Sequence, residues 1–149
     1  MPYTNAKISE QLALLDNIAP ISQGAGTVTS GWVNAANFER FLAVLQTGVL
    51  GASATVDAKL QQAQDSGGTG AKDVTGKAIT QIVKATGDGK QVEINLRAEE
   101  LDINNSFSYF RLSVTVGTAA SLIGAAIYGA VPKNFPASAL NNATVVQIV

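Results

Sequence analysis

The sequence contains no cysteine and no histidine. The absence of cysteine excludes disulfides, thiol nucleophiles and thiolate-based zinc sites. The absence of histidine removes the usual general base near neutral pH, and with it the common serine triads. A Ser–Lys pair stays open from composition alone, but no such pair has a suitable spacing and context. We therefore predict a protein that is not an enzyme, with no catalytic residues, no metal and no cofactor.

Charged side chains are also scarce. They make up 14% of the chain, whereas about a quarter is usual. Lysine and arginine number 10, aspartate and glutamate 11, and the net charge is -1. Because the basic residues are scattered, the chain lacks the concentrated basic patch that nucleic-acid binding requires. A surface so poor in charge is expected to be neutral and polar, or to be partly covered by partners.

Long apolar runs are missing as well. The most apolar segment, residues 119–131, is shorter than the roughly 20 residues of a membrane-spanning helix and contains Gly124 and Gly129. The first residues, MPYTNAKISEQ, show neither a basic region nor an apolar run of the kind found in signal peptides. We expect a protein made in the cytoplasm that has no membrane partner.

Residues 107–118, FSYFRLSVTVGT, alternate between apolar and polar side chains. Phe110, Leu112, Val114 and Val116 would face one way, and the intervening residues the other. This period of two predicts a β-strand with one face on a core and one toward water.

Further strands are predicted on similar grounds. Residues 90–101 alternate most cleanly, and residues 54–65 alternate too, although their composition also allows a helix. Residues 40–50 are apolar on both alternations, as in a central strand or a buried helix. The remaining predicted strands lie near residues 28–33, 77–85 and 121–131. Residues 65–76 are rich in glycine and are predicted to form a surface loop.

Many short strands separated by turns, within 149 residues, predict one all-β domain with a β-sandwich fold. An eight-stranded jelly roll fits this strand count. We expect the sandwich to span residues 22–132, between an N-terminal docking arm (1–21) and a C-terminal tail (133–149).

Both extensions carry apolar residues that must dock somewhere. In the arm, Ile8, Leu12 and Leu15 have helical spacing with Ser9 as a possible cap, so a short helix is one interpretation and an extended arm the other. Residues 144–149, TVVQIV, are β-branched and uncharged. Such a segment should pair, with its own sheet or with another chain, because an exposed one invites edge-to-edge association.

These features define a set of candidate interface residues. Trp32, the only tryptophan, is interpreted either as an anchor of the sheet or as an interface hot spot. The full set is Ile8, Leu12, Leu15, Ile21, Trp32, Val145, Val146 and Ile148.

Three other patterns could indicate chemistry. Glu99, Glu100 and Asp102 form the only dense carboxylate group, but neighbouring strand residues diverge, so strand-end ion pairs or turn caps explain them better than a hydrolase site. Asp102, Asn104 and Asn105 could hold calcium, although ordinary turn chemistry accounts for them equally well. The GTGAK stretch in the glycine-rich loop lacks the full spacing of a phosphate-binding loop.

Most of the chain also resembles a known family. It is similar to a small structural protein encoded in the head-gene clusters of tailed bacteriophages and prophages. The matching segments are residues 9–20, 31–48, 54–82, 97–119 and 136–140.

The resemblance implies a virion component without catalytic residues. Together with the docking-prone ends, it predicts a capsid decoration, or cement, protein on the outer capsid surface. Its expected partners are the major capsid protein and further copies of itself, with a trimer favoured. A head–tail connector or tail protein is the alternative, and a glycan-binding attachment module is less well supported because aromatic residues are few and dispersed.

Overall fold

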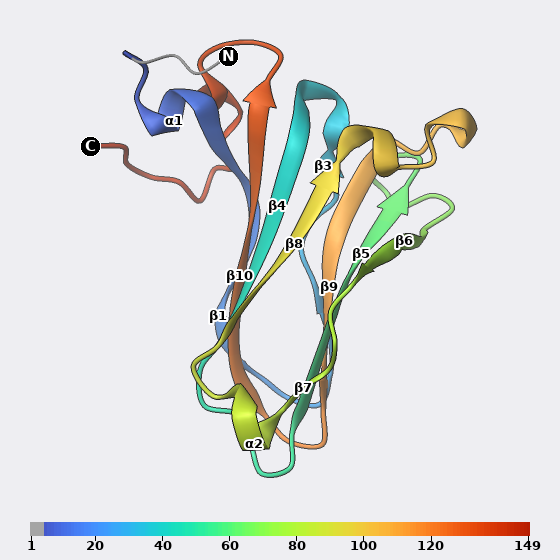
Figure 1. Ribbon diagram of the computed structural model, residues 1–149, viewed down its shortest axis with the longest axis vertical. Coiled ribbons are helices and arrows are strands. Elements are labelled where there is room, and N and C mark those ends of the chain that lie inside the picture. Colours follow the sequence, from blue (N-terminus) through green and yellow to red (C-terminus); the bar gives the residue numbers. More distant parts are fainter. Residues whose placement is uncertain (1–4) are drawn as a thin grey trace.

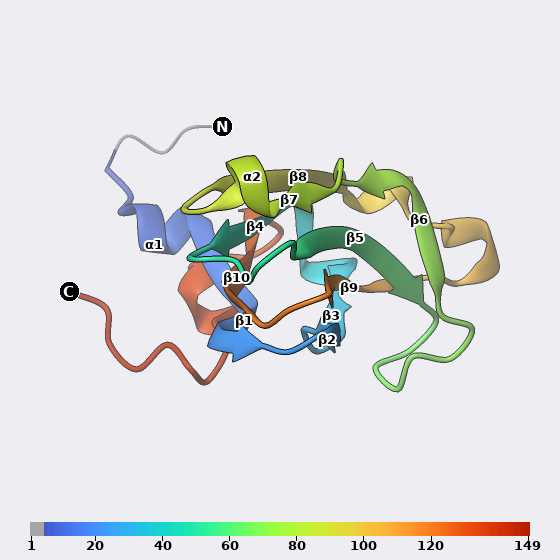
Figure 2. The same ribbon diagram turned by 90° about the horizontal axis from the view of Figure 1, so that it is seen from below.

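The computed structural model describes residues 5–149, so residues 1–4 of the predicted arm lie outside the described residues. Two antiparallel sheets face each other (Figures 1 and 2). Sheet A contains, in spatial order, β1 (Leu12–Gln23), β10 (Ser121–Pro132), β4 (Phe38–Thr47) and β8 (Gln91–Arg97). Sheet B contains β2 (Gly26–Thr29), β9 (Tyr109–Gly117), β5 (Thr55–Ala63) and β6 (Lys72–Ala78), with the short β3 (Val33–Asn34) on β9 and β7 (Ile82–Val83) on β5.

The strand pairs are nested along the chain. β1 pairs with β10, β2 with β9, β4 with β8, and β5 with β6, all antiparallel. The chain therefore behaves as one long hairpin that is rolled up so that its strands divide between two sheets. This is the strand order of a jelly roll, and it confirms the predicted all-β sandwich.

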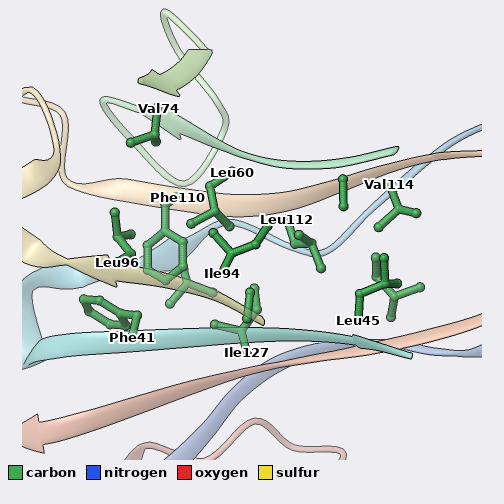
Figure 3. Close-up of a cluster of buried hydrophobic side chains, with 14 of the residues drawn as sticks. Phe41, Leu45, Leu60, Val74, Ile94, Leu96, Phe110, Leu112, Val114 and Ile127 are labelled. Carbon is green, nitrogen blue, oxygen red and sulfur yellow. The ribbon is translucent and has the colours of Figure 1, made fainter. Parts of the chain in front are cut away.

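The core lies between the sheets and is almost entirely aliphatic and aromatic (Figure 3). Phe41 of sheet A packs edge-on against Phe110 of sheet B, with ring centroids 4.7 Å apart. Gly129 of β10 lets this layer close, because a Cβ there would lie only 2.7 Å from Leu15 Cδ1 and 2.9 Å from Phe38 Cγ. Core density of this kind makes each large side chain costly to remove.

The alternation of residues 107–118 is confirmed in β9. Phe110, Leu112, Val114 and Val116 are all 1% exposed or less. The opposite face of β9 is less exposed to solvent than predicted, because Ser113 is also buried, at 5% exposure.

Segments 40–50, 54–65, 90–101 and 121–131 form the strands β4, β5, β8 and β10 within one or a few residues of the predicted bounds. The helical alternatives for β4 and β5 are not adopted. Cross-strand hydrogen bonds to β8, β9 and β10 outweigh the helix propensity of their Ala, Leu and Gln residues.

The helical interpretation of the arm holds for one turn only. α1 (Ile8–Gln11) has Lys7, not Ser9, at its N-cap, and the Lys7 N–H donates to the Glu10 carboxylate at 2.7 Å. From Leu12 the chain is extended as β1, the alternative interpretation. The predicted arm boundary at residue 21 lies inside β1, since pairing with β10 begins at Leu12.

The region from residue 65 to 85 differs from the prediction. β6 occupies residues predicted as loop, and the predicted strand 77–85 is reduced to β7 followed by the short helix α2 (Lys84–Gly87). Gly76, with φ of +76°, lies inside β6, and the register against β5 shifts there. The glycines of this segment predicted a loop. It forms the strand β6 because its backbone groups hydrogen-bond to β5.

Short 3₁₀ turns complete the structure. They are η1 (Ala35–Asn37), η2 (Ala98–Glu100), η3 (Ile103–Asn105) and η4 (Ala137–Leu140). η4 follows β10 and packs beside β1 and α1, with Ala137 fully buried.

Replacing Phe110 by alanine tests the core. We expect Phe110→Ala to lower the free energy of unfolding by about 3–5 kcal/mol, because it removes a buried ring and leaves a cavity. Thr115→Ala, on the outer face of the same strand, should cost no more than about 1 kcal/mol, the value of its hydrogen bond to Thr27. Urea unfolding followed by tryptophan fluorescence measures both, and equal losses would contradict the assignment of faces.

Candidate docking surface

The exposed large apolar side chains are concentrated at one edge of the sandwich. Apart from Val49, Val83 and Ile103, every such side chain of the described residues belongs to α1, β1, β10 or the segment after β10. We call the part on α1, β1, β10 and the loop after β10 the β1–β10 surface. Its members are Ile8, Leu14, Ile21, Leu122, Val131 and Phe135. An apolar concentration of this kind marks a site of interaction more often than a random surface does.

The outer face of sheet B has the opposite character. Its side chains bond to one another across neighbouring strands. Lys59 pairs with Asp73 at 2.9 Å, Arg111 Nε donates to Gln61 at 3.0 Å, and the Thr27 and Thr115 hydroxyls lie 2.9 Å apart. A face whose polar groups are satisfied by one another and by water is suited to remain in solvent.

The outer side of sheet A is hollowed in three places. A groove of about 700 Å³ lies over β10 and β4, with Leu14, Val44, Ala126 and Tyr128 in its lining. A second hollow, about 460 Å³, lies where α1 meets the end of β10. A third, about 410 Å³, lies around Ile21 and Leu122 at the opposite end of the β1–β10 ladder. The outer side of sheet A is therefore hollowed at both ends and in the middle of the β1–β10 ladder.

The chain after η4 is attached to the free side of β1. The Asn142 N–H donates to the Leu14 carbonyl at 2.8 Å, and the Leu14 N–H donates to Asn141 Oδ1 at 2.9 Å. Asn142 Oδ1 also accepts from the Thr144 N–H at 2.9 Å. This asparagine clamp, Asn141 and Asn142, determines where the following segment leaves the body.

Beyond the clamp, residues 144–149 run out from the sandwich (Figures 1 and 2). They form no strand with either sheet in the described chain. Val146 is 91% exposed and Ile148 52%. Pairing of this segment with its own sheet is thus not observed, and the expectation that it pairs with another chain stays a prediction.

Most of the predicted interface residues are brought together at this edge. Ile8 and Leu12 line the hollow beside α1, Ile21 lines the third hollow, and Val145 and Val146 border the groove. Ile148 extends beyond them. Their role in binding stays a prediction.

Two predicted residues lie elsewhere. Leu15 is half-buried and packs against the core, so its side chain points away from the surface. Trp32 lies between β2 and β3, where the Arg111 guanidinium stacks on its ring at 4.4 Å. This contact matches the interpretation of Trp32 as a structural anchor.

Sequence reasoning missed Leu14, Leu122, Val131 and Phe135 as members of the surface. A signal for Leu14 existed, because a strand reading of residues 12–18 places Leu12 and Leu14 on one face. The helical spacing of Leu12 and Leu15 pointed to Leu15 instead of Leu14. The other three lie on or after β10, whose outward face could not be identified without its neighbours.

The carboxylate group is structural. Glu100 accepts from the Arg97 N–H at 2.7 Å and pairs with Lys77 at 3.1 Å, while Glu99 pairs with Arg97 at 3.0 Å. Asp102 pairs with Lys72 and accepts from Asn105. The backbone bond from Arg97, helped by Lys77, holds the pKa of Glu100 below its usual range despite partial burial. Lys77 is therefore the side chain that forms the ion pair with Glu100.

The glycine-rich loop is closed by its own aspartate. Asp65 accepts from the Gly67 N–H at 2.9 Å, from the Thr69 N–H at 3.1 Å and from the Thr69 hydroxyl at 2.6 Å. These bonds lower the pKa of Asp65. A phosphate would have to compete with this carboxylate for the same N–H groups, which fits the interpretation as a surface loop.

Within residues 5–149, no cluster of three or more acidic side chains has the geometry to hold a metal ion. Over the same residues, no helix is both long and apolar enough to cross a membrane.

No protein-family model and no curated protein matches the chain. Solved structures with some similarity include a chain of Broad Bean Stain Virus, with 11% identity, 91% of each chain covered and a TM-score of 0.48. The CBM22-1 xylan-binding domain of Paenibacillus barcinonensis Xyn10C has 12% identity over 84% of this chain and 99% of its own, with a TM-score of 0.45. A chain from naturally occurring empty particles of Cowpea mosaic virus has 9% identity over 90% and 91%, with 0.43. All three scores lie below 0.5, so these likenesses decide neither the fold nor the function of this chain.

The hydrogen bond and the ion pair of Glu100 predict how the free energy of unfolding changes at acid pH. A pKa lowered by folding gives stability that is present at neutral pH and is lost as pH falls through the carboxyl range. Glu100→Gln should reduce the free energy of unfolding by up to about 1 kcal/mol at pH 7, and the difference from wild type should shrink on acidification. Since histidine is absent, wild-type stability should stay nearly flat between about pH 6 and 8. Urea unfolding across pH tests this, and a difference that grows toward acid would contradict it.

Proposed function

We propose that this protein is a virion structural protein that decorates and cements a bacteriophage head shell. The observation that carries the proposal is the contrast between its faces. The β1–β10 surface and the 144–149 segment expose apolar side chains, whereas the outer face of sheet B is covered by mutually bonded polar ones. A protein that is fixed in an assembly needs an apolar face that contacts its partners and a polar face that remains in solvent.

The expected orientation follows from this contrast. The β1–β10 surface would lie on the major capsid protein, and sheet B would face solvent on the outer capsid surface. Exposed contacts such as Ile21 and Leu122 are individually modest, but a symmetric shell repeats each of them many times. Copies at local threefold positions, associated as trimers, would bridge neighbouring capsid subunits. The resemblance to proteins of phage head-gene clusters supports the same role.

The alternative within the virion is a head–tail connector or tail protein. The same apolar edge would serve a ring of copies equally well, so copy number separates the two roles. A glycan-binding module is less well supported, because Arg111 covers one face of the only tryptophan ring.

Copy number per particle is the first test. In purified virions, quantified by mass analysis against the major capsid protein, a decoration protein should approach one copy per shell subunit, whereas a connector would give about a dozen. Particles that lack the protein should assemble and rupture more easily. Absence of the protein from the particle, or equal robustness without it, would refute the cementing role.

The orientation is tested by matched charge insertions. Leu122 is 46% exposed on the β1–β10 surface, and Thr75 is exposed on β6 of sheet B. Leu122→Glu should weaken binding to preformed shells at least about 10-fold, because burying a carboxylate against a partner is unfavourable. Thr75→Glu should bind as wild type. Co-sedimentation with shells measures both, and loss of binding by Thr75→Glu alone would reverse the orientation.

A further inference from the structure

The groove over β10 and β4 has a floor of small side chains. Its volume is about 700 Å³, within the range of ligand pockets. In the register of sheet A, Ala126 of β10 lies between Asn17 of β1 and Val44 of β4. Glu93 of β8 follows Val44, and Gly124 also lines the groove. The groove therefore crosses the sheet from β1 to β8 over side chains that are too small to fill it.

Most polar side chains around this floor have no partner in the described chain. Neither a hydrogen bond nor an ion pair is formed, within residues 5–149, by the side chains of Asn17, Gln46, Gln91, Glu93, Tyr128 and Gln147. This is the reverse of the outer face of sheet B, where such groups bond to one another. Because each amide both donates and accepts hydrogen bonds, the groove can satisfy the N–H and C=O groups of a polypeptide.

One wall of the groove already shows this kind of bonding. Residues 144–147 line it, attached through the asparagine clamp, whose amide oxygens accept the N–H groups of Leu14 and Thr144 at 2.9 Å each. Beyond Val145, the backbone groups of residues 146–149 form no hydrogen bond within the described chain. An extended segment laid beside them would find free N–H and C=O groups on one side and the amides of Gln46 and Gln91 on the other.

The charge of the groove is negative. Among its described lining residues, Asp16 and Glu93 are the only charged ones, and neither forms an ion pair. The Asp16 carboxylate accepts from the Asn17 N–H at 2.7 Å, whereas that of Glu93 accepts no hydrogen bond from the described chain. A partner that covers a free carboxylate must place a cation or a donor opposite it. Charge complementarity therefore favours a segment with lysine or arginine over an acidic or phosphorylated one.

We propose that this groove receives an extended segment of the major capsid protein that carries a lysine or arginine opposite Glu93. The inference rests on the decoration role proposed above and specifies the chemistry of the partner at that face. The segment lies across Ala126 and Val44, between residues 146–149 and β8. Its backbone bonds to the free amides, and its cation pairs with the carboxylate.

Two groove variants and two matched controls test the proposal. Glu93→Arg reverses the charge that faces the segment, and Glu39→Arg makes the same change at an exposed position of β4 outside the groove. Ala126→Phe fills the floor, and Thr75→Phe places the same ring on exposed β6 of sheet B. Co-sedimentation of each full chain with preformed shells, over a range of salt concentrations, measures the affinity. Urea unfolding verifies that each variant is folded.

We expect wild type, Glu39→Arg and Thr75→Phe to bind alike, with an affinity that falls as salt rises. Glu93→Arg should bind at least about 10-fold more weakly and lose most of that salt dependence, and Ala126→Phe should be weakened by a similar factor. Binding of either groove variant at wild-type affinity, or equal weakening by the controls, would overturn the inference and leave the decoration role standing. Tighter binding by Glu93→Arg would indicate an acidic partner and would overturn it too. A wild type that does not sediment with shells would remove the decoration role and this inference together.

Discussion

The antiparallel pairing of the first long strand with the last one is the contact on which the rest of the structure depends. β1 and β10 are separated by almost the whole chain, yet they pair from Leu12 to Gln23, with two register shifts, at the edge of sheet A. Because the inner pairs are nested within this one, closing it completes both sheets and encloses the core. It also brings both described ends of the chain to the same side of the molecule (Figure 1).

That shared side explains the composition. The few charged residues are mostly used in local ion pairs and caps, such as Lys59 with Asp73 and Lys77 with Glu100. The β1–β10 surface is made of apolar side chains, and the neighbouring groove adds only two carboxylates, Asp16 and Glu93. A monomer in water gains nothing from such a surface, whereas a subunit of an assembly buries it. The low charge of the chain and its exposed apolar ends therefore have the same cause: few charged side chains remain for the β1–β10 surface.

The candidate surface was only partly predictable. Ile8, Ile21 and Val146 were identified because apolar residues near chain ends have few neighbours to cover them. Leu15 was predicted with them by a helical period, but these residues form a strand and Leu15 packs against the core. Leu122 and Val131 were not recognised, because an apolar residue in a buried-looking run gives no sign of which face it will occupy. Exposure is a property of neighbours, and here the neighbour is β1, more than ninety positions away.

By itself, the sequence determined the strands whose side chains alternate, the residues of β9 that enter the core, and the absence of cysteine and histidine chemistry. These are local properties, set by a period of two and by residue chemistry. Only the tertiary structure decided the nested pairing, the strand β6 hidden among glycines, and the exposure of Leu14 and Leu122. Each of these depends on hydrogen bonds and packing between distant segments, which no local pattern records.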